Sequence, residues 1–105
     1  MAQFVAYQNP NPTSRKQFPY LLDIQSNLLD DLRTTIVVPL SPSESVANIT
    51  ISKLNPVLDI SGNRYTAMVQ DMAGIDRNQL GREFCDLTHY RSEIIAAVDF
   101  VLSGI

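Results

Sequence analysis

The sequence contains few of the side chains from which enzyme and metal sites are usually built. Its 105 residues include one cysteine, one histidine and no tryptophan. One cysteine cannot form an internal disulfide, and a zinc site normally needs about four ligands with close paired spacing. Cys85 and His89 could share a helix face, but we expect Cys85 at or before the helix start, where it is a buried structural residue. We therefore predict no enzymatic activity and no metal site.

Glycine is also scarce, and the four glycines form no phosphate-cradling motif. The acidic pair Asp30-Asp31 could bind a hard cation only with ligands from elsewhere, so a solvated turn is the better interpretation. These absences predict that the protein needs no cofactor.

Basic residues are few and scattered. Eight lysines and arginines stand against eleven acidic residues, giving a net charge of -3. A DNA-binding domain normally shows a clustered basic surface, so we expect no direct nucleic-acid binding. The first residues lack the basic start and apolar run of a secretory signal, and no apolar run approaches the ~20 residues of a membrane-spanning helix. We therefore expect a cytoplasmic protein without a membrane partner.

The composition is that of one globular domain covering residues 1–105, with 45% hydrophobic and 18% charged residues. Short runs rich in β-branched and aromatic residues predict five strands, at residues 3–7, 20–24, 34–38, 57–60 and 65–69. Pro39 should end the third strand or mark a sheet edge. Residues 61–64 carry a hairpin signal, and residues 41–56, with a short alternation at 49–51, predict a small peripheral excursion.

One long helix is predicted at the C-terminal end, starting near Asp86 or Thr88, either of which can cap its first turn. An apolar stripe at helical spacing should pack on the sheet; it consists of Leu87, Ile94, Ile95, Val98, Val101 and Leu102. Phe100 lies off this stripe, and it either packs under a neighbouring loop or faces a second chain.

Two segments have both a structural and a binding interpretation. Gly104 can take the left-handed conformation that stops a helix, with Ile105 touching back toward Phe100. An isoleucine at an exposed end is unusual unless something covers it, so a partner could do so. Leu28 and Leu29 interrupt a polar loop, and they either contact a partner or fold inward under the sheet.

The order and spacing of several segments resemble the CcdB family, toxins of toxin–antitoxin pairs that target DNA gyrase. The resemblance spans nearly the whole chain and rests on Gln3-Phe4, residues 23–30, Val37-Val38-Pro39-Leu40, Asn55-Pro56-Val57, Asp71-Met72-Ala73, Asp86-Leu87, Arg91 and Gly104-Ile105. It implies a mainly β fold with a C-terminal helix: an SH3-like antiparallel barrel plus a small extra sheet, assembled as a homodimer.

The resemblance also implies a function. Such a toxin binds the gyrase A subunit and stabilises gyrase attached to cleaved DNA, and a CcdA-like antitoxin neutralises it. The gyrase-facing residues carried over by position are Leu28, Leu29, Asp99, Leu102, Ser103, Gly104 and Ile105. The best-known family member has tryptophan at the position of Ser103, and a neutral amide at the position of Asp99. Serine cannot stack on an arginine as tryptophan can, so the alternative is a CcdB-fold protein with weakened or lost gyrase poisoning that acts as an antitoxin-binding module.

Overall fold

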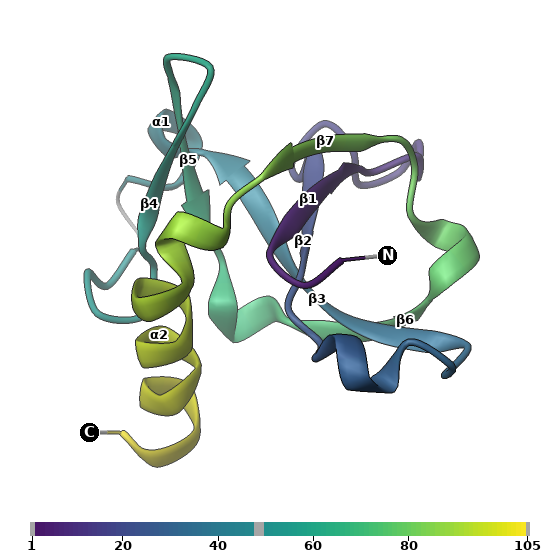
Figure 1. Cartoon of the computed structure of the whole chain (residues 1–105). Coiled ribbons are helices and arrows are strands. Elements are labelled where there is room, and N and C mark those ends of the chain that lie inside the picture. The colour runs from purple at the N-terminus through teal and green to yellow at the C-terminus, as the bar shows by residue number, and fades with distance from the viewer. Residues whose placement is uncertain (1, 48–49, 105) are drawn as a thin grey trace.

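A curled antiparallel sheet and one long helix make up the protein, seen here in a computed structural model that describes residues 2–47 and 50–104 (Figure 1). The sheet contains β1 (Val5–Gln8), β2 (Tyr20–Asp23), β3 (Thr34–Pro42), β4 (Val57–Ile60), β5 (Asn63–Ala67), β6 (Ala73–Asp76) and β7 (Glu83–Asp86). The helices are α1 (Ser43–Val46), α2 (Arg91–Ser103) and the single 3-10 turns η1 (Asn27–Leu29), η2 (Val69–Asp71), η3 (Arg77–Gln79) and η4 (Thr88–Tyr90).

Strand pairing connects all seven strands into one sheet. The order is β4-β5-β3-β2-β1-β7, with β6 paired to the first half of β3. The strands around β1 and β2 curl into a half-barrel, while β4 and β5 extend from the second half of β3 (Figure 1). This confirms the predicted mainly β class with a C-terminal helix. The small extra sheet is present as β4 and β5, and it is continuous with the barrel through β3.

Side-chain alternation buries both faces of the central strands, because successive residues of a strand point to opposite sides. One face contributes Ala6, Leu22 and Val38 to the main core, which Ile94 and Ala97 of α2 also join. The opposite face forms a second cluster of Val5, Tyr7, Leu21, Val37 and Leu80. The central strands β1, β2 and β3 are therefore buried on both faces.

Pro39 lies inside a strand, so the prediction that it ends β3 or marks an edge is wrong. It pairs with Leu21 of β2, and its carbonyl accepts a hydrogen bond of 2.9 Å from Met68 N on the other side. Ile24 N donates to Ile36 O at 3.0 Å, so the backbone groups of Ile36 point toward β2. Backbone N–H and C=O groups of successive residues point to opposite sides of a strand, so the nitrogen of Pro39, three residues later, points away from β2. The nitrogen faces Met68, at the point where the pairing partner of β3 changes from β5 to β6, so the missing N–H costs few strand hydrogen bonds.

The hairpin is tighter than the sequence predicted. Ile60 pairs directly with Asn63, so the loop is only Ser61 and Gly62, with φ angles of 54° and 85°. Two left-handed residues make a type I′ turn, whose twist suits an antiparallel hairpin. The second strand of the hairpin therefore starts and ends two residues earlier than expected.

Two strands, β6 and β7, were not predicted. Each has four residues, and neither shows a buried and exposed alternation. Ala73 and Gly74 of β6 have low strand propensity, so pairing with β3 decides its conformation. Similarly, β7 is a strand because it pairs with β1.

The C-terminal helix starts later than predicted. The Asp86 carboxylate accepts a 2.8 Å hydrogen bond from Thr88 N, the first residue of η4, and α2 begins only at Arg91, so neither Asp86 nor Thr88 caps α2. The stripe packs on the core through Leu87, Ile94, Ile95 and Val98. Its last members, Val101 and Leu102, are exposed, so the expectation that the whole stripe covers the sheet is wrong for this final turn.

The excursion predicted at residues 41–56 begins later than expected, because its first two residues belong to β3. β3 runs on to Pro42 and α1 follows it, with Val46 buried. Part of the predicted 49–51 alternation lies outside the described residues. Among the residues that are described, no helix is long and apolar enough to span a membrane.

Candidate functional site

The leucine loop, defined here as residues 25–33 between β2 and β3, holds apolar side chains in water. Leu28 is 94% exposed, Leu32 is 49% exposed and Leu29 is 45% exposed. The alternative in which Leu28 and Leu29 fold inward under the sheet is therefore wrong. Exposed leucines gathered on one short polar loop are typical of a contact surface rather than of scattered surface residues.

Hydrogen bonds hold the backbone of the leucine loop. Ser26 caps η1 by accepting from Leu28 N at 3.2 Å, and Leu29 N donates to Ser26 O at 3.0 Å. At the base of the loop, the buried Asp23 carboxylate accepts from Thr35 Oγ1 at 2.8 Å and from Gln25 N at 3.1 Å. The loop is therefore ordered by its own polar side chains while its leucines remain free.

The tip of α2 is the second exposed apolar feature. Leu102 is 74% exposed and Val101 lies beside it in the same last turn. Gly104 has a φ of 72°, and its N–H donates to Phe100 O at 2.8 Å, which confirms the predicted glycine stop. The expected contact of Ile105 with Phe100 lies outside the described residues.

Polar side chains at the tip of α2 are exposed too. Ser103 Oγ donates to Asp99 O at 2.7 Å, one turn earlier in the helix. Its hydroxyl is thus already hydrogen-bonded within the helix. Asp99 carries an exposed carboxylate on the same turn. Among the described residues, the tip therefore exposes two apolar side chains, Val101 and Leu102, beside a negative charge.

The leucine loop and the tip of α2 do not meet within one chain. Figure 1 shows η1 below the half-barrel and the end of α2 on the opposite side of the view. Within this chain they are two separate exposed apolar features rather than one continuous surface.

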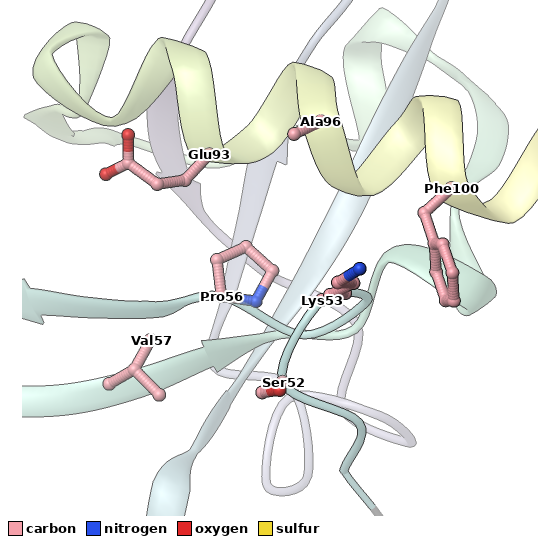
Figure 2. Close-up of a pocket in the computed structure, with 7 residues that line it drawn as sticks. All are labelled: Ser52, Lys53, Pro56, Val57, Glu93, Ala96 and Phe100. Carbon is pink, nitrogen blue, oxygen red and sulfur yellow. The ribbon is translucent and has the colours of Figure 1, made fainter. Parts of the chain in front are cut away.

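Phe100 does not belong to the exposed tip, because its side chain points toward a pocket beside α2. With Glu93 and Ala96 it lines a pocket of about 500 Å³ opposite Lys53, Pro56 and Val57 (Figure 2). This placement favours the interpretation in which Phe100 packs beside a neighbouring loop.

Cys85 and His89 lie on different elements. Cys85 is in β7, packed against the main core, and burial raises the pKa of its thiol. A raised pKa makes a cysteine less nucleophilic at neutral pH. His89 is exposed in η4, where its ring lies 4.3 Å from the ring of Tyr90. This arrangement fits a structural thiol. Within residues 2–47 and 50–104, no group of three His, Cys, Asp or Glu side chains could hold a metal ion.

Sequence reasoning missed Leu32 as a member of the exposed leucine set. It is an apolar residue between Asp31 and Arg33, so it carried the same signal as Leu28 and Leu29. It also missed the contacts that Arg77, from η3, makes with this loop. No local pattern links those residues, which are more than 40 positions apart.

A comparison of the chain with models of known protein families gives a match. The family described as CcdB protein matches residues 3–104, which is nearly the whole chain.

Proposed function

Because this chain belongs to the CcdB family of toxin–antitoxin toxins, we propose that it binds the A subunit of DNA gyrase and stabilises the complex of gyrase with cleaved DNA. The observation that carries this proposal is the exposure of Leu28 and Leu102, at positions that the family resemblance assigns to gyrase contact. Both side chains cost free energy in water and gain it when a partner covers them.

The proposed contact surface contains Leu28, Leu29, Asp99, Leu102, Ser103, Gly104 and Ile105. A homodimer would present two copies of each part, so that gyrase could contact one α2 tip and one leucine loop from each protomer. A CcdA-like antitoxin would cover the toxin and prevent this contact. Since gyrase acts on the chromosome, the protein would work in the cytoplasm, by binding rather than by catalysis.

The direct test adds purified protein to gyrase, plasmid DNA and ATP, and measures DNA that is cleaved and covalently attached to gyrase. Cleaved DNA should accumulate at micromolar protein. Truncation before Ser103 should abolish this effect at little cost in stability, because residues 102–104 are exposed. Leu102→Ser should weaken it, whereas Ile51→Ser, which removes an exposed isoleucine elsewhere, should not. No cleavage by the unmodified protein would refute the proposal.

A second candidate is a CcdB-family protein that has lost gyrase poisoning and binds an antitoxin only. Ser103 favours it, because the hydroxyl is bonded to Asp99 O and offers no aromatic surface. Growth arrest on expression in gyrase-sensitive cells, absent in cells with a resistant gyrase, would exclude this candidate. Ser103→Trp should tighten gyrase binding if the tip docks as proposed, and an unchanged affinity would place the contact elsewhere.

A further inference from the structure

Arg77 reaches across from η3 and holds the backbone of the leucine loop. Its Nε donates to Leu32 O at 2.6 Å and its Nη2 donates to Leu29 O at 3.1 Å. One rigid guanidinium thus joins two carbonyls of the loop. The loop and the end of β6 that precedes η3 lie side by side (Figure 1).

The backbone from which the Arg77 side chain projects is itself held in place. Arg77 N donates to Arg33 O at 2.9 Å, and the preceding Asp76 forms an ion pair of 2.7 Å with Arg33. Asp76 also caps η3 by accepting from Asn78 N at 3.1 Å. The guanidinium therefore projects from an anchored turn.

Hydrogen bonds fix the conformation of the leucine loop, and the two that Arg77 donates add to those that polar side chains of the loop make themselves. Its leucines are exposed, so core packing does not position them, and the loop depends on hydrogen bonds. Hydrogen bonds at an exposed site add little to the stability of the whole fold, because water replaces them on unfolding. They can still keep the loop in one conformation, and a preordered loop loses less entropy when it binds.

We propose that Arg77 is a positioning residue for partner binding: it holds the leucine loop so that Leu28 and Leu29 stay exposed in a fixed place. This inference rests on the proposed gyrase binding. Arg77 touches backbone carbonyls of the loop rather than the partner, so its effect must pass through the leucines.

The test measures the affinity of gyrase A for the full-length protein by a surface or calorimetric method. Arg77→Ala should weaken binding by about tenfold, mainly through faster dissociation, since the freed loop must be ordered on binding. Its urea midpoint should stay close to that of the unmodified protein. Arg64→Ala removes the same charge from an exposed position in β5 and is the matched control. It should change the affinity by no more than about twofold.

Two comparisons separate positioning from simple charge attraction. Lysine keeps the charge but not the two-pronged geometry, so Arg77→Lys should bind more weakly than the unmodified protein. In a Leu28→Ala, Leu29→Ala background, Arg77→Ala should have almost no further effect, because the side chains that it positions are gone. An unchanged affinity for Arg77→Lys, together with a salt-dependent association rate, would overturn the positioning role in favour of charge steering.

A measurement without gyrase completes the test. Arg77→Ala should speed hydrogen exchange at Leu29 N and Leu32 N, whose hydrogen bonds close the loop. If the unmodified protein binds gyrase and Arg77→Ala binds equally well, the role of Arg77 is overturned while the proposed function stands. If the unmodified protein does not bind, both are overturned.

Discussion

Asn55 makes a hydrogen bond that the neighbouring backbone cannot make, and its replacement by alanine should show what that bond contributes. Ala67 N donates to Pro56 O at 2.9 Å, and the register of β4 and β5 places these residues directly opposite each other. In such an antiparallel pair, the N–H of residue 56 would normally donate a second hydrogen bond to Ala67 O. Proline has no N–H, and the Asn55 Nδ2 donates to Ala67 O at 3.1 Å instead.

The cost of losing this side chain follows from its surroundings. Asn55 is 3% exposed and Ala67 is fully buried, so Asn55→Ala leaves a buried carbonyl without a donor. An unpaired buried group costs about 1–3 kcal/mol, and each lost hydrogen bond about 1 kcal/mol more. The other two partners, Ile51 N and Gln70 Oε1, belong to exposed residues that water can reach. We expect a loss of about 2 to 3 kcal/mol in the free energy of unfolding, or roughly 10 °C in Tm.

Urea and thermal unfolding at one fixed protein concentration measure this loss, since self-association would make Tm depend on concentration. Pro56→Ala gives Ala67 O a backbone donor, so Asn55→Ala should cost about 1 kcal/mol less in that background. Asn78→Ala, at an exposed asparagine, is the control. Equal costs in both backgrounds would refute the view that Asn55 replaces the missing proline N–H.

Three more outcomes follow from the described geometry. Ser61→Asn should raise the free energy of unfolding measured in urea by about 0.5 kcal/mol, because asparagine suits the left-handed first position of a type I′ turn. Gly81→Ala should destabilise by about 1–3 kcal/mol in the same assay, since a Cβ would lie 2.7 Å from Gln8 O, whereas Gly74→Ala, with open space around it, should not. Hydrogen bonds from Asn78 and Arg33 lower the pKa of Asp76, and those from Thr88 lower the pKa of Asp86, both from 3.8. Carboxyls with a lowered folded pKa stabilise the fold above their unfolded pKa, so stability should fall as pH drops below about 4, and less steeply in Asp76→Asn.

Local patterns in the sequence predicted the elements whose signals are themselves local. Residues 20–24 and 57–60 form strands close to the expected bounds because β-branched and apolar side chains suit a buried strand. Gly104 ends α2 as expected, since glycine adopts positive φ at little cost. The polar neighbours of Leu28 and Leu29 left two interpretations open, a partner contact or inward packing, and the exposure of both side chains rules out inward packing.

Other features depended on neighbours far away in the chain. β6 and β7 are strands because β3 and β1 offer them partners, which their own four residues do not reveal. Pro39 stays within β3 because its nitrogen faces the place where β3 changes partner. Val101 and Leu102 continue the helical stripe in the sequence but extend beyond the sheet that would cover them.

Propensity and side-chain polarity act within a few residues, so local patterns were enough to predict the mainly β class with a C-terminal helix, the glycine stop of α2 and the two leucines that interrupt a polar loop. The polar side chains that hold distant segments together could be found only in the folded chain. Arg77 is joined to Leu29 and Leu32 across more than 40 residues, and Asn55 to Ala67 across 12. Such contacts depend on the path of the folded chain, since hydrogen-bond partners are set by distance in space rather than by spacing in the sequence.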